Sequence, residues 1–306
     1  MRFAGQGLRS AVLLISVVAL GACSRGGDAP EVSASPPTAE QEARWALPMD
    51  SYVMNQIEVA VYGQAEDYLV KDCMATQGQS WDMAAFSESQ LSAPVQSPSG
   101  LRIFDEKIAQ TYGYTFPPVY PADVAAERTR LNRVTLTDAQ QAAFKSCLQE
   151  ARDRLGPMSA QDLSNQMSMR LQDIWTQATS DGAVATAAEQ WRSCMAPQGI
   201  PDLPDAPYGH DAGMPTASQF ASWGISPADS ASGAAPSAAE IAAAMADAAC
   251  RTSSGYTDAL YQAEWRLQVK ALHDDASLAD DGQRARQTYD KVLADCRAVI
   301  AAHGGA

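Results

Sequence analysis

Basic residues and histidine are scarce in this chain of 306 residues. It has 22 Lys and Arg against 36 Asp and Glu, a formal net charge of −14, and only three His. An acidic chain repels phosphate backbones and anionic lipid headgroups, which argues against a nucleic-acid partner and against electrostatic membrane binding. The acidity favours either solubility of an exported protein or binding of a cationic partner.

Common catalytic and metal-binding motifs are also absent. The sequence contains no G-x-S-x-G, no H-E-x-x-H, no glycine-rich phosphate loop and no Cys-x-x-Cys, so no motif indicates a hydrolase, a metalloprotease, a nucleotide enzyme or a thiol oxidoreductase. The His residues at 210, 273 and 303 lack a second ligand at helical or hairpin spacing, even near Asp211 and Met214. We therefore expect no cofactor and no metal site.

The composition favours helices over strands. Charged residues make up only 19% of the chain and Ala is abundant, and Ala fills a helix without loss of side-chain entropy. A hydrophobic content of 46% can build a core at this length. The sequence predicts an all-α protein, with apolar stripes at steps of three and four around 53–73, 101–112, 144–155, 163–178, 184–194, 220–223, 237–250, 258–273 and 285–299.

The N-terminus has the pattern of an export signal. Arg2 and Arg9 precede an uncharged apolar run over 11–20, which is too short for a permanent membrane-spanning helix. The run ends in Leu20-Gly21-Ala22-Cys23, which resembles the lipobox of bacterial lipoproteins. The resemblance implies that 1–22 is a signal peptide and that Cys23 carries acyl chains such as palmitate, which anchor the protein to the extracytoplasmic face of the cell membrane. A plain secretory peptide cleaved after an Ala-x-Ala-like site is the alternative.

The segment after Cys23 is rich in Gly, Ser, Pro and Ala. It contains Gly26-Gly27 and Pro36-Pro37 and has too few large apolar residues to bury a core. We expect 23–48 to be a flexible tether. Without Arg2 and Arg9, 20 basic residues face 36 acidic ones, so the mature chain carries a formal charge of −16.

An internal repeat organises the rest of the chain. Cys-Met-Ala-x-Gln-Gly occurs at 73–78 and again at 194–199, each time at the end of an apolar helical stripe. Gly113 aligns with Gly224, and Cys147 with Cys250. We expect two similar helical units, 49–180 and 181–306, which form separate domains or share one core. The motif resembles that of a group of uncharacterised actinobacterial lipoproteins, and this resemblance implies location and architecture but no activity.

Five cysteines remain after Cys23, so at least one stays unpaired. Equivalence of the repeats predicts the disulfides Cys73–Cys147 and Cys194–Cys250, with Cys296 as the free thiol. The competing arrangement pairs residue 147 with 194 and residue 250 with 296. We expect the bridges to be structural, because a redox-active pair normally uses the missing Cys-x-x-Cys motif.

Tryptophans are the candidate binding residues. Trp191 and Trp265 lie on helical stripes and are expected in the core, whereas Trp81 and Trp223 lie beside irregular loops and are candidates for a cleft. We expect a non-catalytic binding or scaffolding component of the cell envelope, whose partner is an envelope protein, a peptide or a glycan. The alternative is an enzyme that acts on cell-wall material with Asp or Glu as acid and base.

Overall fold

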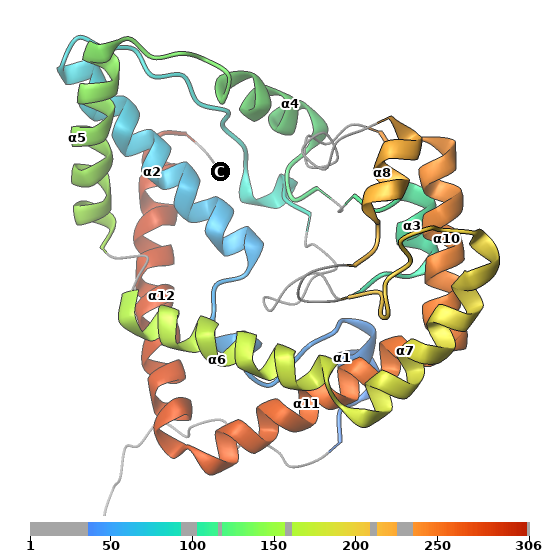
Figure 1. Ribbon diagram of the computed structural model, residues 1–306. Helices are drawn as coiled ribbons and strands as arrows, with labels where there is room; N and C mark the ends of the chain where they lie inside the picture. The colour runs from blue at the N-terminus through green and yellow to red at the C-terminus, as the bar shows by residue number, and fades with distance from the viewer. Residues whose placement is uncertain are drawn as a thin grey trace, which may run out of the picture. The chain divides into compact units, whose positions relative to one another are not determined.

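The computed structural model describes residues 36–92, 103–115, 118–156, 161–208, 213–224 and 235–304, with the backbone alone at 161–166. All regular structure in these ranges is helical (Figure 1), so the all-α prediction is confirmed. The α-helices are α1 (Ala39–Ala43), α2 (Gln56–Thr76), α3 (Glu106–Tyr112), α4 (Ala122–Leu131), α5 (Asp138–Leu155), α6 (Gln161–Thr179), α7 (Gly182–Met195), α8 (Ala217–Trp223), α10 (Ala238–Ser253), α11 (Tyr256–Asp274) and α12 (Ala276–Ala302). Single 3₁₀ turns occur at η1 (Asp50–Tyr52), η2 (Glu88–Gln90) and η3 (Ala196–Gln198). Within these ranges, no helix is long and apolar enough to cross a membrane.

Capping side chains fix where several helices begin. Thr137 and Thr216 each exchange hydrogen bonds with the Gln three residues later, which satisfies two backbone N–H groups at the starts of α5 and α8. At α10, Ser237 accepts from the backbone N–H of Glu240, but the Glu240 side chain accepts from the backbone N–H of Tyr114 at 3.1 Å. The sequence pattern of a capping box at Ser237 and Glu240 is therefore only half realised, because the Glu side chain bonds to a distant segment instead.

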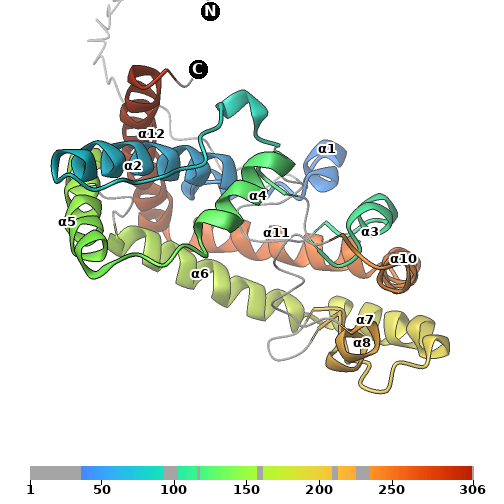
Figure 2. The same ribbon diagram turned by 90° about the horizontal axis from the view of Figure 1, so that it is seen from above.

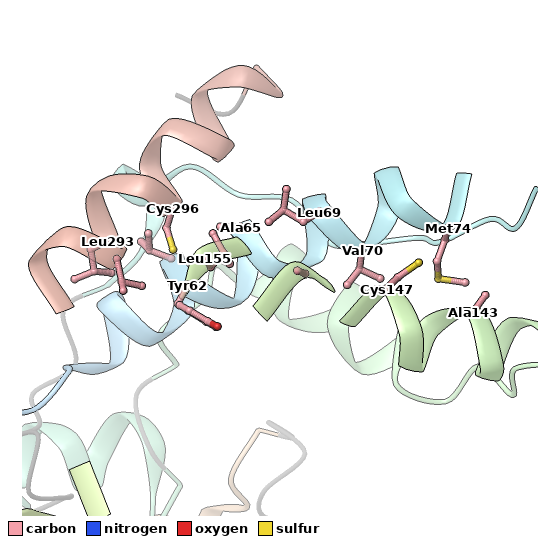
Figure 3. Close-up of a cluster of buried hydrophobic side chains, with 13 residues drawn as sticks. Tyr62, Ala65, Leu69, Val70, Met74, Ala143, Cys147, Leu155, Leu293 and Cys296 are labelled. Atoms are coloured by element: carbon pink, nitrogen blue, oxygen red, sulfur yellow. The ribbon is translucent and has the colours of Figure 1, made fainter. Parts of the chain in front are cut away.

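Helix α2 packs against both α5 and α12 (Figure 3). Its buried face meets Ala143 and Cys147 of α5, and Leu293 and Cys296 of α12. The last helix of the chain thus completes a core that begins with the first long helix. Burying these apolar side chains supplies the main stabilisation of this part of the fold.

Other helices also pack across the boundary between the sequence repeats. Helix α3 lies against α10, where Ala109 and Tyr114 meet Ala244 and Ala248, and Figures 1 and 2 show the two helices side by side. Helix α11 packs against α6 and α7. Helices from both repeats therefore share cores, which is the second of the two arrangements considered for the repeat.

The prediction of a flexible tether over 23–48 is wrong for its last part, Thr38 to Pro48, because the chain is folded there. Helix α1 lies here, and Trp45 and Leu47 are 2% and 5% exposed. The indole N–H of Trp45 donates to Glu264 Oε2 at 2.8 Å, and the next buried residue, Met49, donates its backbone N–H to the side chain of Gln268 at 2.8 Å. The apolar side chains gain burial on α11, which also supplies acceptors for their polar groups. Residues 23–35 lie outside the described ranges.

Two further segments differ from the expectation. Helix α3 begins at Glu106, because the side chain of Asp105 accepts from the backbone N–H of Ile108 at 2.7 Å and caps it there. Helix α4 lies outside the apolar stripes that predicted helices and follows a proline-rich stretch. Pro121 lies at its N-cap, a place where a missing backbone N–H costs nothing.

Candidate functional site

Two disulfides join equivalent helices of the repeat. Cys73 of α2 is bonded to Cys147 of α5, and Cys194 of α7 to Cys250 of α10, each with Cα atoms 5.6 Å apart. Cys296 is reduced and buried. The predicted pairing is confirmed, and the arrangement that would link residues 147 and 194 does not occur.

The first cysteine of each bridge lies at the edge of its core. We expected Cys73 and Cys194 to point inward, but Cys73 is half-buried and Cys194 is exposed. The following residues, Met74 and Met195, are the ones with no exposed surface. Successive helix residues diverge by about 100°, so Met and Cys cannot share one face, and the larger apolar side chain takes the core.

Each repeated helix end leads to a pocket. The glycines that close the repeated motif, Gly78 and Gly199, have φ values of 69° and 65°, a left-handed conformation that Gly adopts without strain. Trp81 follows the first and lines a pocket of about 380 Å³, which we call the Trp81 pocket. Its lining comprises Asp67, Ser80, Trp81, Asp82, Met83, Ala84, Arg128, Leu131, Asn132, Val134, Leu136 and Gln140.

Three polar groups of the Trp81 pocket lie close together without a direct ion pair among them. The Trp81 ring stacks on Phe144 with centroids 4.6 Å apart, and its indole N–H is buried without an acceptor at hydrogen-bond geometry. Neither Asp67 nor Arg128 forms an ion pair with another described residue. Buried polar groups are hydrogen-bonded in most proteins, so the Trp81 indole N–H distinguishes the pocket from ordinary surface.

Electrostatics connect these three groups. Burial raises the pKa of Asp67, while the Arg128 guanidinium and the nearby Trp81 indole act to lower it. The Arg128 guanidinium carbon lies 4.6 Å from the centre of the Tyr120 ring, a cation–π contact that orients the guanidinium. A carboxylate, a guanidinium and an indole N–H thus line one cavity.

A second pocket, which we call the Trp223 pocket, follows the second repeated helix end. It measures about 320 Å³ and is lined by Met195, Gln198, Gly199, Ile200, Pro201, Ser218, Gln219, Ser222, Trp223 and Ala243. Its polar groups have protein partners: Ser218 donates its backbone N–H and its hydroxyl to Asp202, and Gln219 accepts from the backbone N–H of Thr216 at 2.9 Å. The Ser218 hydroxyl is the main cause that lowers the pKa of Asp202 to about 2. This pocket offers a ligand mainly apolar contacts.

The most buried carboxylates have structural partners. Asp247, with no exposed surface, accepts from Trp191 Nε1 at 2.8 Å and pairs with Arg251 at 2.6 Å. Glu240 and Glu264 accept from Tyr114 and from Trp45. These contacts hold distant segments together, and none of the three carboxylates lines the Trp81 pocket or the Trp223 pocket.

Other candidate residues carry no site in the described ranges. No group of three or more His, Cys, Asp or Glu is arranged to hold a metal there, and His210 and Asp211 lie outside those ranges. Trp191 has no exposed surface. Trp265 of α11 is half-buried and packs against the core cluster that contains Leu260 and Tyr261. Both positions agree with the helical stripes in the sequence.

Comparison with protein-family models, curated proteins and solved structures finds no match to this chain. Sequence reasoning named Trp81 and Trp223, and each lines a pocket. It missed Asp67, which lies among other polar residues of α2, and Arg128, which lies on the unexpected helix α4; no local motif marks either one.

Proposed function

We propose that this chain is an exported, lipid-anchored protein of the extracytoplasmic membrane surface that binds a small ligand in the Trp81 pocket without chemical change. The sequence Leu20-Gly21-Ala22-Cys23 supports the anchor. The convergent polar groups of the Trp81 pocket support binding, because a cavity of 300–1,000 Å³ with a few such groups is the usual form of a small-molecule site. The acidic net charge argues against nucleic acid as the ligand.

The anchor is tested by replacing Cys23 with Ala. The variant should lose incorporation of labelled palmitate and leave the membrane fraction or remain unprocessed, whereas Cys296→Ala should behave as the native protein. Two or three acyl chains bury enough methylene groups for stable attachment, at roughly 0.8 kcal/mol for each methylene, whereas one chain gives only marginal binding. Membrane attachment of a processed Cys23→Ala protein would contradict the proposal.

Binding is tested by thermal shift of the purified full-length protein against a panel of amino acids, sugars, nucleotides and polyamines. A ligand should raise the melting temperature in proportion to the logarithm of its concentration. Trp81→Ala should abolish that shift, and Trp223→Ala, which alters the other pocket, should retain it. A panel with no effect, or a shift that survives in Trp81→Ala, would count against this site.

A second candidate function, an enzyme that cleaves cell-wall material, draws support from Asp67. Burial raises the pKa of its carboxyl, and a raised pKa suits a general acid beside a cavity. Release of soluble fragments from cell-wall material by the native protein but not by Asp67→Asn would favour this candidate. Unaltered material would leave binding as the role of the pocket.

A further inference from the structure

The Trp81 pocket presents charges of both signs, and neither forms a direct ion pair with a described residue. Asp67 comes from α2 and Arg128 from α4, and both line the same cavity. We infer that the ligand of this pocket is a small zwitterion, such as a free amino acid or a short peptide, with its ammonium group at Asp67 and its carboxylate at Arg128. This inference rests on the proposed binding function and specifies its ligand class.

Charge complementarity selects this class over simpler ligands. An anion would suit Arg128 but would meet the carboxylates of Asp67 and Asp82 in the same cavity. A cation would suit Asp67 but would be repelled by Arg128. A neutral ligand would displace water from both charged groups without replacing it by an opposite charge, which is costly for groups that are already half-buried. A zwitterion satisfies both groups at once.

The geometry of Arg128 suits a carboxylate. Its guanidinium carbon lies over the Tyr120 ring, a cation–π contact that restrains the planar group and its N–H donors. Those donors can bind the two oxygens of a carboxylate side by side, an arrangement that gives both strength and orientation. The ring contact also reduces the side-chain entropy that binding would otherwise remove.

Trp81 supplies the remaining donor. Phe144 fixes the ring by stacking on it, and the buried indole N–H lies near the Asp67 carboxylate but has no acceptor at hydrogen-bond geometry. A carboxylate or peptide carbonyl oxygen of the ligand would provide that acceptor. The Trp223 pocket lacks this set, because its polar groups already bond to the protein and no charged side chain lines it.

The test measures binding to the full-length protein by isothermal titration calorimetry. The probes are the free amino acids, L-alanyl-L-alanine, cellobiose, succinate and putrescine. At least one amino acid or the dipeptide should bind, and blocking either its amino group by acetylation or its carboxyl group by amidation should weaken binding by about 10- to 100-fold, as expected for hydrogen bonds to charged groups. In the variants Asp67→Asn and Arg128→Gln, the affinity for the unblocked probe should fall to a similar extent.

Matched controls separate the pocket from general surface charge. Arg130→Gln removes an exposed arginine from the same helix α4, where it pairs with Glu127 at 2.6 Å, and should leave affinity unchanged. Trp81→Phe keeps an aromatic ring on Phe144 but removes the N–H, and should weaken binding. Saturable binding of cellobiose, succinate or putrescine with no response to any zwitterion would overturn the ligand class and leave the binding function standing. No binding of any probe would overturn both.

Discussion

The ion pair between Asp247 and Arg251 should be essential to the stability of the packing around α10. Asp247 accepts from Arg251 Nε at 2.8 Å and from Arg251 Nη2 at 2.6 Å, and it also accepts from the Trp191 indole. Arg251 is 2% exposed and lies 4.4 Å from the centres of both the Phe104 and Tyr208 rings. Burial acts to lower the pKa of Arg251, but the facing Asp247 carboxylate raises it, so the guanidinium stays charged.

Asp247→Ala would leave this buried cation without its counterion and the Trp191 N–H without its acceptor. Removing one partner of a buried ion pair costs about 3–5 kcal/mol, so the free energy of unfolding should fall by about that amount. The double variant Asp247→Ala, Arg251→Met should recover much of the loss, because it no longer buries an unpaired charge. Urea unfolding followed by circular dichroism and tryptophan fluorescence measures both effects.

An exposed pair serves as the control. Glu40 and Arg44 have the same four-residue spacing on α1, at 3.5 Å, and both side chains are more than three-quarters exposed. Glu40→Ala should leave the urea midpoint unchanged, since exposed pairs contribute little. A loss below about 1 kcal/mol in Asp247→Ala, or a double variant no more stable than the single one, would refute the reasoning.

Three further predictions concern packing, cross-links and pH. Gly282→Ala should lower the free energy of unfolding in urea by about 1–3 kcal/mol, because its new Cβ would clash with the Tyr52 ring. Gly63→Ala on α2 is the control: its Cβ meets nothing within 4 Å, so this variant should be more stable by up to about 1 kcal/mol. Equal effects of the two substitutions would contradict this prediction. Replacing Cys194 and Cys250 together by Ser should cost about 4 kcal/mol by loop entropy over a separation of 56 residues, and an unchanged melting temperature would oppose a structural role. Hydrogen bonds to the Val299 carbonyl and to Asp72 raise the pKa of His303 above 6.5, so their stabilisation is present below pH 6.5 and is lost as the pH rises through the raised value. An NMR titration that places this pKa at or below 6.5 would contradict the prediction.

Local patterns were enough to predict much of the helical framework. The capping boxes at Thr137 and Thr216 depend on residues three apart, so the sequence alone locates them. The disulfide pairing depends on equivalence between the repeats, which the order of Cys and Gly makes visible.

Long-range pairing could not be predicted in the same way. Trp45 is an isolated aromatic in a proline-rich segment, and its acceptor Glu264 lies 219 residues away. The packing of α12 on α2, and the meeting of Asp67 with Arg128, likewise depend on tertiary contacts that no local motif encodes. The inward position of Met74 in place of Cys73 could have been anticipated from helix geometry, because adjacent residues cannot both face the core.

The central claim is that the Trp81 pocket binds a ligand. Its most direct test follows the indole N–H resonances of the six tryptophans, assigned by single substitutions, while L-alanyl-L-alanine and the free amino acids are titrated into the full-length protein. The account predicts a saturable shift of the Trp81 resonance, because its buried N–H gains an acceptor, with little change at Trp223. A shift at Trp223 with Trp81 unmoved, or no shift at either residue, would contradict it.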